Sequence, residues 1–455
     1  MTKRLRSSDN TALPVISNRS PEYQSEGDGP GVHSAQQWPV SKDAMSAART
    51  FLQECASARQ PTLLLPDKDA DGLCSGLILY HTLCALGLPP QLLTVHFVAK
   101  GSNVHAPDER AQLASYQARY LVLVDQGSRP GPPIVDSEEA KVLIVDHHAS
   151  DSFPANAQVL SAAGCEPVAT SSTLAYLLCR PLVASADSAS SELKERLEYL
   201  CVMGTMGDLG AGFKWEAPFP DMRVCMKRWT KKALAEAVSL LNAPRRTARY
   251  DVIAAWDALM HASSPRELVS SSAPLIKRLH AARDEVRREV ERCTHTAPMF
   301  SGDGRVALIR ISSTAQVHPL IATRWAATLK SARLEMVMCA NDGYLPGEAK
   351  TNFACRIARC ALTRGQTDDA REIDVMEMLK QYASHVLGLQ SAMGEDFARG
   401  HRQASGGIVM TAHFERLWNA MKETEPEIRE AGPSQKKRKA WPSQGNTLES
   451  WLRKT

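Results

Sequence analysis

The spacing of apolar residues changes near Ala44, and from there on it predicts alternating helices and strands. Short continuous apolar runs between polar or turn residues are typical of buried strands, and apolar residues three or four apart are typical of helices. Continuous apolar strands separated by helices indicate a parallel sheet that is covered on both faces. We expect helices at 47–59 and 72–86, and strands at 62–65, 92–98, 120–124 and 142–145.

A mostly helical region between residues 170 and 262 follows this first set of strands. Within 272–293, Leu275, Leu279 and Val286 lie at helical spacing among charged residues, which predicts an amphipathic helix that connects two domains. After Pro298 the alternation of strands and helices restarts, so we expect a second α/β domain. Its expected strands are 305–311, 334–339 and 351–358, and its expected helices are 318–329 and a segment from 374 on.

The chain of 455 residues is long enough for two folded domains, given ~100–200 residues per domain. Residues 1–44 are rich in Ser, Pro and Gly and lack apolar periodicity, so we expect a disordered arm. The predicted fold is α/β, with a parallel-sheet domain joined by a helical linker to a smaller α/β domain. The boundaries are 45–262 for the first domain, 263–297 for the linker, 298–422 for the second domain and 423–455 for a disordered basic tail.

Composition narrows the class of protein only slightly. Lys and Arg number 54 against 50 Asp and Glu, and a net charge of +4 is too small to imply nucleic-acid binding without local basic patches. The 11 cysteines contain no CxxC pair, which fits reduced thiols in an intracellular protein and argues against structural zinc. No apolar run reaches the ~18 residues of a membrane span, so we expect no membrane partner.

Acidic residues and histidines follow the predicted strands of the first domain. The carboxyl ends of parallel strands meet at one edge of a sheet, where open α/β sheets bind their ligands. Carboxylate oxygens together with imidazole suit divalent cations such as Mn²⁺ and Mg²⁺. The candidates in chain order are Asp67, Asp69 and Asp71 in the turn before Gly72, then Asp125, the triplet Asp146-His147-His148, and Asp208 in a glycine-rich segment.

In order and spacing, these four segments resemble the motifs of the DHH phosphoesterases, in particular the RecJ-type single-strand exonucleases. Residues 241–246 resemble the Asn-Ala-x-x-Arg segment of RecJ-type proteins. Residues 353–356 and 400–407 are similar to the Arg-bearing strand and the GGH loop of the accessory DHHA1 domain. Many relatives have a His where this chain has Leu65, and Asp67 then supplies the missing ligand. Arg399 replaces the first Gly of the GGH loop.

The resemblance implies that two metal ions activate a water for attack on a phosphodiester. The expected ions are Mn²⁺, with Mg²⁺ as the alternative. His148 and Asp146 are the expected catalytic residues, with His148 meeting a phosphoryl oxygen. The implied metal ligands are Asp67, Asp69, Asp71, Asp125, His147 and Asp208. The implied substrate-binding residues are Asn242, Arg246, Arg356, Gly400 and His401.

Simpler interpretations exist for several of these residues. A single Asp after a strand is usually a helix cap or turn residue, and Asp67 fits that role as well as direct ligation. Arg246 and Arg356 could form salt bridges between the domains, and His401 could be an ordinary hydrogen-bonded loop residue. We interpret His318, which precedes Pro319, as a helix-start residue without a catalytic role.

Two features of the tail suggest a location and a partner. The run Lys436-Lys437-Arg438-Lys439 has the form of nuclear localisation signals and nucleic-acid-binding patches, so we predict a nuclear protein, with the cytoplasm as the alternative. Leu448, Trp451 and Leu452 resemble the peptide that binds the sliding clamp, although Gly445 occupies the position of that motif's Gln. A sliding clamp is therefore a predicted partner.

Three functions from different classes remain open at this point. The first is an exonuclease that hydrolyses single-stranded DNA or RNA from an end. The second is a phosphatase or phosphodiesterase of short oligonucleotides or small nucleotides, which the same metal site would serve. The third is a non-catalytic DHH-type replication scaffold, and the retained acidic cluster argues against it.

Overall fold

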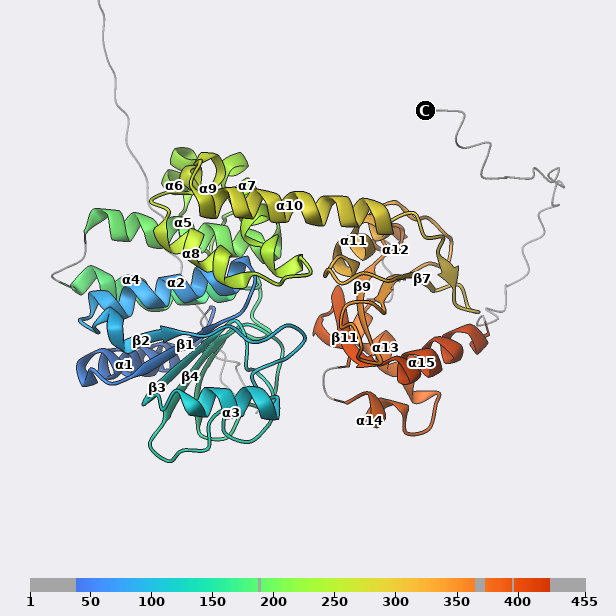
Figure 1. The fold of residues 1–455 in the computed structure, drawn as a ribbon, viewed down its shortest axis with the longest axis horizontal. Coiled ribbons are helices and arrows are strands. Elements are labelled where there is room, and N and C mark those ends of the chain that lie inside the picture. Colours follow the sequence, from blue (N-terminus) through green and yellow to red (C-terminus); the bar gives the residue numbers. More distant parts are fainter. Residues whose placement is uncertain (1–37, 187–189, 365–372, 395–396, 426–455) are drawn as a thin grey trace, which may run out of the picture. The chain divides into compact units, whose positions relative to one another are not determined.

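The computed structural model describes residues 38–186, 190–364, 373–394 and 397–425. These residues form two β-sheets with separate hydrophobic cores, and helices pack against both (Figure 1). The first sheet has five strands and the second has six. The predicted α/β fold, with a parallel sheet followed by a second sheet-containing part, is confirmed.

The first sheet is entirely parallel, in the order β2-β1-β3-β4-β5. The register pairs Pro66 with Val124 and Val124 with Val145, so β1, β3 and β4 end at the same edge. Side chains that directly follow these strands therefore meet there. The strands are β1 (Thr62–Pro66), β2 (Leu93–Val95), β3 (Tyr120–Val124), β4 (Lys141–Asp146) and β5 (Ala157–Ser161).

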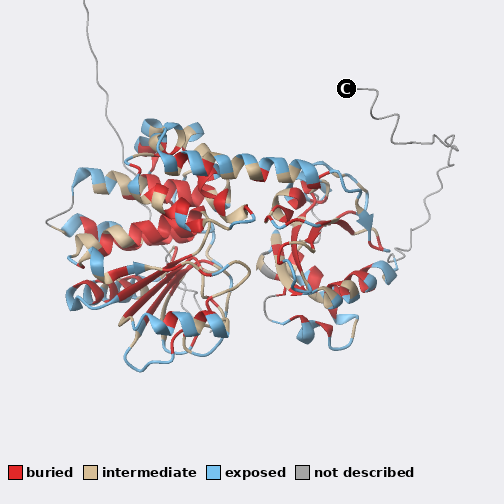
Figure 2. Ribbon diagram, in the orientation of Figure 1, coloured by how far each residue is buried: buried red, intermediate tan, exposed pale blue. Residues whose placement is uncertain are grey.

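Both faces of this sheet are buried, because successive side chains of a strand point to opposite faces. Leu64 of β1 enters the larger core, whereas Leu63 and Leu65 enter a second core that also contains Leu113 of α3 (Pro107–Ser115). Figure 2 shows the central strands as continuously buried. Burial on both faces explains why these strands are continuous apolar runs in the sequence.

The larger core lies between the sheet and a layer of helices. Helix α2 is buried along most of its length because it packs between α4 and α5. The helices of this part are α1 (Lys42–Ala58), α2 (Ala70–Ala85), α4 (Ser171–Ser185), α5 (Ser191–Leu209), α6 (Arg223–Trp229), α7 (Lys231–Leu241), α8 (Val252–His261) and α9 (Pro265–Ser270), with single 3₁₀ turns η1 (Pro90–Leu92) and η2 (Pro244–Arg246). None of the described helices is both long and apolar enough to cross a bilayer.

Helix α10 (Pro274–Cys293) is the predicted connecting helix. Ile276 and Leu279, near its beginning, belong to the larger core of the first sheet. Val286 and Cys293, near its end, belong to the core of the second sheet. One amphipathic helix therefore contributes to two cores, as its apolar spacing indicates.

The second sheet has the order β10-β11-β9-β8-β7-β6. Only β7 and β8 are parallel, and the other neighbouring strands are antiparallel. Its strands are β6 (Met299–Phe300), β7 (Val306–Ile311), β8 (Met336–Asn341), β9 (Lys350–Ile357), β10 (Arg399–His401) and β11 (Ala404–Met410). The helices are α11 (His318–Thr328), α12 (Arg359–Arg364), α13 (Val375–Ser384), α14 (Leu389–Met393) and α15 (Thr411–Glu423).

The beginning of the chain differs from the expected disordered arm at residues 38–44. The Trp38 indole N–H donates to the carbonyl of Pro167 at 2.6 Å. Helix α1 already begins at Lys42 because the Ser41 hydroxyl accepts a hydrogen bond from the N–H of Ala44. Residues 1–37 lie outside the described residues. So do the predicted localisation run 436–439 and the predicted clamp-binding residues Leu448, Trp451 and Leu452.

Candidate metal centre

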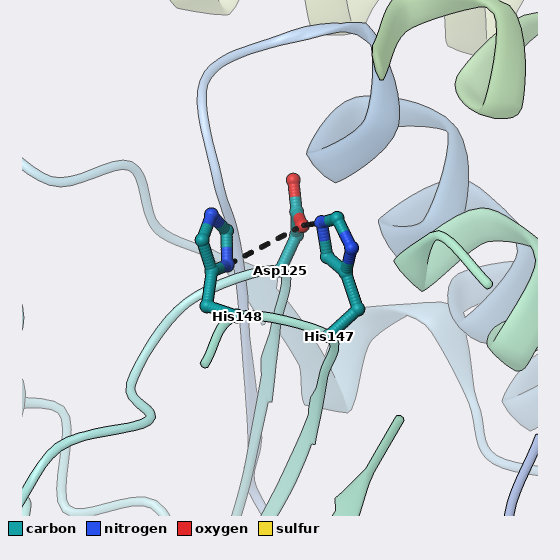
Figure 3. Close-up of side chains that lie close together, drawn as sticks. All are labelled: Asp125, His147 and His148. Carbon is teal, nitrogen blue, oxygen red and sulfur yellow. Dashed lines mark ion pairs between the residues drawn. The ribbon is translucent and has the colours of Figure 1, made fainter. Parts of the chain in front are cut away.

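His147 lies at the centre of the acidic cluster that the strand ends create. Its Nε2 atom is 3.1 Å from Asp208 Oδ2, 3.3 Å from Asp125 Oδ1 and 3.9 Å from Asp71 Oδ2. Figure 3 shows the imidazoles of His147 and His148 on either side of the Asp125 carboxylate. Four segments that are far apart in the sequence therefore meet at the carboxyl edge of the first sheet.

Asp69 is the N-cap residue of helix α2. Its Oδ1 accepts hydrogen bonds from the N–H groups of Asp71 (3.1 Å) and Gly72 (3.2 Å), and its Oδ2 lies 3.5 Å from Arg245 Nη2. Burial raises the pKa of Asp69, but Arg245 and Lys68 outweigh it, so the pKa is lowered. A Cβ atom on Gly72 would lie 2.5 Å from the carbonyl oxygen of Asp67, so this acidic turn requires glycine there.

Asp71 is fully buried against the beginning of α4. Its two carboxylate oxygens accept hydrogen bonds from the backbone N–H groups of Ser171 (2.8 Å) and Ser172 (3.0 Å). Burial, followed by the nearby Asp208, raises the pKa of Asp71 to about 6. The amide donors fix the position of the carboxylate, while its crowded acidic surroundings favour a bound cation.

Asp125 follows β3 with a left-handed backbone, at φ +63°. Positive φ is uncommon for a residue with a side chain, and surrounding structure must hold such a residue in place. Part of that support is the Ser171 hydroxyl, which donates to Asp125 Oδ1 at 2.8 Å. Burial, followed by Asp71, raises the pKa of Asp125 well above its ordinary value.

Asp146 holds the histidine pair. Its Oδ1 accepts from the backbone N–H groups of His147 (2.8 Å) and His148 (3.2 Å) and from His148 Nδ1 (2.8 Å), and its Oδ2 accepts from the N–H of Ser128 (3.2 Å). Both oxygens therefore serve protein donors. This geometry favours a positioning role for Asp146 over the direct catalytic role that the sequence suggested. Since Nδ1 of His148 faces Asp146, its Nε2 is directed away from that carboxylate.

The two imidazoles hold protons in these acidic surroundings. Burial lowers the pKa of His147, but Asp208, whose Oδ2 lies 3.1 Å from Nε2, and the charge of Asp71 outweigh it and raise the pKa to about 9. Burial likewise lowers the pKa of His148, but Asp146 outweighs it and raises the pKa to about 9. A cation that binds to His147 must displace its proton, so the surrounding carboxylates attract protons and metal ions alike.

Three groups of side chains have ligand atoms within 4.8 Å of one another, which is close enough to hold a metal ion. Two of the groups share Asp125 and two share His147, an overlap that suits neighbouring cations with common ligands. Carboxylate oxygens, joined by imidazoles in two of the three groups, fit Mn²⁺ or Mg²⁺. The groups are Asp125, His147 and His148; Asp71, His147 and Asp208; and Asp67, Asp69 and Asp125.

Asp67 has a second partner besides that third group. The ammonium of Lys68 lies 2.8 Å from Asp67 Oδ1. One oxygen of the Asp67 carboxylate therefore belongs to an ion pair, and the other oxygen does not take part in it. Both interpretations from the sequence, metal ligand and turn residue, fit this arrangement.

Asn242 and Arg245 support the acidic turn from outside. Asn242 is buried, and its Oδ1 accepts from the N–H of Ala70 (3.2 Å) and from Arg245 Nε (3.1 Å). Arg245 Nη1 also donates to Gln316 Oε1 at 3.2 Å. The predicted substrate-binding residue Asn242 thus holds the start of α2 in place. Arg245 is not among the residues predicted from the sequence, although the doubled arginine of Asn-Ala-Pro-Arg-Arg was the available signal.

Arg246 and Arg356 form a cationic cluster beside His318, whose imidazole is kept neutral by burial and by the two guanidinium charges. Burial, followed by Arg245, lowers the pKa of Arg246 to about 9, and Arg356 acts in the same direction. Burial also lowers the pKa of Arg356. In the described part of the chain, neither arginine forms an ion pair with a carboxylate, and Arg356 Nη1 donates to the carbonyl of Cys355 at 2.8 Å. The salt-bridge interpretation therefore has no support there, and the cluster suits an anion.

The predicted GGH-like loop is the β10–β11 hairpin, whose residue Ala404 pairs with Arg356 of β9. Gly400 has φ +125°, and a Cβ atom there would lie 2.4 Å from the carbonyl oxygen of Ala404. The hairpin therefore requires glycine at this position. The backbone of His401 belongs to β10, but its side chain lies outside the described part of the structure.

Fold and site together define an α/β protein with a candidate Asp and His cation site at the carboxyl edge of a parallel sheet, followed by a second, mixed sheet. Residues 62–205 match the DHH family, N-terminal domain, so this part of the chain is a DHH-family domain. A comparison with curated proteins gave no sequence match.

Solved structures share the fold over most of the chain. RecJ from Thermus thermophilus in complex with Mn²⁺ matches with a TM-score of 0.55 and 16% identity, over 84% of this chain and 55% of that chain. A structure of exonuclease RecJ bound to manganese matches with a TM-score of 0.55 and 16% identity, over 86% of this chain and 98% of that chain. The DHH domain of a member of the s1p family of ribosomal proteins matches with a TM-score of 0.55 and 12% identity, over 84% and 91%.

The chain thus spans about half the length of the Thermus RecJ. At these identities the likeness concerns the fold. The predicted membership of the DHH superfamily, with a RecJ-like fold, is confirmed.

Proposed function

We propose that this chain is a metal-dependent phosphodiesterase that removes nucleotides from an end of single-stranded nucleic acid. The observation that carries the proposal is the overlap of the three ligand groups around Asp125 and His147. The DHH-family domain and the RecJ-like fold support it. We assign catalysis to a domain at residues 45–262 and substrate binding to a DHHA1-type domain at residues 298–422. Residues 263–297 form the linker between these two domains.

We propose two Mn²⁺ ions as the cofactor, because the donors are oxygens and imidazole and because the RecJ structures contain manganese. When bound, such ions lower the pKa of a water and stabilise the attacking and leaving oxygens of an in-line displacement. Asp125 is the candidate ligand shared between the two ions. The other proposed ligands are Asp69, Asp71, His147 and Asp208, with Asp67 as an additional one.

His148 is the group of this chain that we assign to the phosphoryl oxygen. The hydrogen bond from its Nδ1 to Asp146 directs its Nε2 away from that carboxylate. Asp146 raises the pKa of His148 to about 9 against the effect of burial, so this carboxylate favours the protonated imidazole. A protonated Nε2 donates to an oxygen on which negative charge develops, and that stabilises the transition state.

Arg246 and Arg356 are the proposed binding groups for the substrate's other phosphates. Burial and the like charges of Arg245 and Arg356 depress the pKa of Arg246, and an anion bound between the arginines would relieve the repulsion. A guanidinium also pairs with phosphate through two parallel hydrogen bonds. The cluster therefore suits a phosphate that neighbours the scissile one.

The test is Mn²⁺-dependent degradation of end-labelled single-stranded DNA and RNA, from about 20 nucleotides down to dinucleotides, which spans the usual length of a single-strand site. Asp208→Asn removes a proposed ligand. Asp284→Asn removes a carboxylate that is 55% exposed on α10 and serves as the matched control. Wild type and control should produce ladders from long strands, while Asp208→Asn should not.

The other outcomes select the alternatives. Cleavage of dinucleotides alone would replace the exonuclease with a phosphodiesterase of short oligonucleotides. Tight Mn²⁺ binding without any cleavage, together with an intact cellular role for Asp208→Asn, would favour the non-catalytic scaffold. The nuclear location and the sliding-clamp partner depend on the tail and remain predictions.

A further inference from the structure

A cavity that contains none of the proposed metal ligands lies beside the loop that joins η2 to α8. Its volume is about 380 Å³, which is in the range of ~300–1,000 Å³ typical of ligand sites. Its lining combines apolar and charged side chains from three segments. These are Phe97, Arg249, Tyr250, Asp251 and Ile253, together with Arg278 of α10.

The cavity has an apolar part. Ile253, in the first turn of α8, is 64% exposed, so its side chain is accessible to a ligand. The half-buried ring of Phe97 is held by the ring of Trp256, with centroids 5.7 Å apart. Together these two side chains offer a firm apolar surface of the kind on which a nucleobase packs.

The cavity also has a cationic part. Arg278 forms an ion pair with Asp251 at 2.6 Å, so its charge is largely compensated. Arg249 is exposed, and in the described part of the chain it forms no ion pair or hydrogen bond through its side chain. One uncompensated guanidinium beside an apolar surface matches the two halves of a nucleotide, its phosphate and its base.

Tyr250 lies in the loop that joins this cavity to the turn Pro244–Arg246. It has φ +53°, and its hydroxyl donates to the carbonyl of Val98 at 3.2 Å, so its ring is fixed as a wall of the cavity. The N–H of Asp251 donates to the carbonyl of Pro244, which joins the cavity loop to the turn that bears Arg246.

We propose that this cavity binds one nucleotide of a single-stranded nucleic acid beyond the nucleotide being cleaved, with a phosphate on Arg249 and the base against Phe97 and Ile253. The proposal rests on the proposed function and deepens it, because it makes the substrate a strand that continues past Tyr250. On this proposal the cavity takes a nucleotide beyond the two that flank the scissile bond, so a dinucleotide leaves it empty.

Arg249→Ala and Ile253→Ala test the proposal, because both side chains are exposed and their loss leaves the core intact. Each should raise KM for a single strand of about 20 nucleotides roughly tenfold and leave dinucleotide cleavage unchanged. Arg249→Ala should also reduce the salt dependence of binding by about one phosphate contact, a slope change of ~0.7. Lys232→Ala removes an exposed charge from α7, outside the cavity, and should change neither value.

Unchanged KM for the long strand in both variants would overturn the proposal. Equal losses on long strands and dinucleotides would also overturn it, because they would indicate a general disturbance of the protein. Fluorescence anisotropy with a labelled strand in EDTA measures binding without cleavage, so it tests the nucleotide-binding cavity independently of the proposed nuclease activity. If Arg249→Ala weakens binding there while wild type cleaves nothing with Mn²⁺, the cavity is upheld and the proposed function fails.

Discussion

Gly204→Ala is the most direct way to disturb the metal centre without touching a proposed ligand. Gly204 lies on α5, where a Cβ atom would be 1.8 Å from Ser172 Oγ and 2.8 Å from Asp71 Oδ1. Real Cβ atoms do not approach other atoms so closely. The added methyl group must therefore displace the Ser172 side chain, the Asp71 carboxylate, or both.

The size of the effect follows from the contacts that would be lost. The Ser172 hydroxyl donates to the carbonyl of Asp71 at 3.0 Å, and losing that bond costs about 1 kcal/mol. Overpacking of a close contact costs about 1–3 kcal/mol, while alanine gains about 1 kcal/mol over glycine within a helix. We expect net destabilisation of about 1–3 kcal/mol. Mn²⁺ affinity should fall by about 10–100-fold, as when a residue that orients a ligand is changed.

Calorimetric titration with Mn²⁺ and urea unfolding of the metal-free protein measure the two effects separately. Gly207→Ala is the matched control, because Gly207 lies on the same helix and its Cβ would meet Ala70 Cβ at a milder 3.0 Å. Gly207→Ala should therefore lose much less Mn²⁺ affinity than Gly204→Ala. If Gly204→Ala binds Mn²⁺ as tightly as wild type, then Asp71 does not contribute to a metal site in the way its geometry indicates.

Three further predictions concern groups around the centre. Asp146→Asn places an amide among four N–H donors and removes the charge beside His148, so kcat should fall about 10–100-fold with little change in KM; an unchanged kcat in steady-state assays would contradict the positioning role. Arg356→Ala should raise KM about tenfold without lowering the melting temperature, because it relieves the repulsion on Arg246; a lower melting temperature would point to a structural role. Burial, and after it the charge of Arg356, lowers the pKa of His318 from 6.5 to about 3. Below pH 6.5 the unfolded chain therefore binds a proton that the folded protein does not bind. Between about pH 6 and pH 4 the free energy of unfolding of wild type should therefore fall by about 1.4 kcal/mol per pH unit more than that of His318→Gln. Urea unfolding at each pH measures both values, and an equal pH dependence of the two proteins would refute this.

The first sheet could be predicted from the sequence because both of its faces are buried. Residues 120–124 are apolar without interruption, and the predicted strand coincides with β3. The hairpin β10–β11 was not predicted as strands, since Gly406 and Gly407 lower strand propensity. The structure explains why residue 406 is a glycine, because a Cβ atom there would lie 2.3 Å from the carbonyl oxygen of Phe353 in β9. Only the partner strand makes the glycine necessary.

The proposed ligands could be predicted because each follows a strand or lies in a glycine-rich segment, and parallel strands end at one edge. The groups that hold them could not. Ser171 and Ser172 follow Thr170, and in the sequence such a run indicates only a helix N-cap. Their contacts with Asp71 join residues about 100 positions apart, and no local pattern encodes them.

Those supporting contacts also explain how a cluster of buried carboxylates can exist in a folded protein. Two backbone amides hold Asp71, a hydroxyl holds Asp125, and four donors hold Asp146. Donors of this kind compensate a buried negative charge, but they do not remove the repulsion between neighbouring carboxylates, as the raised pKa values of Asp71 and Asp125 indicate. A divalent cation does remove it. The fold therefore fixes the positions of the carboxylates, and a bound cation would remove the repulsion between them. Metal binding and ordering of the site are thermodynamically coupled for that reason.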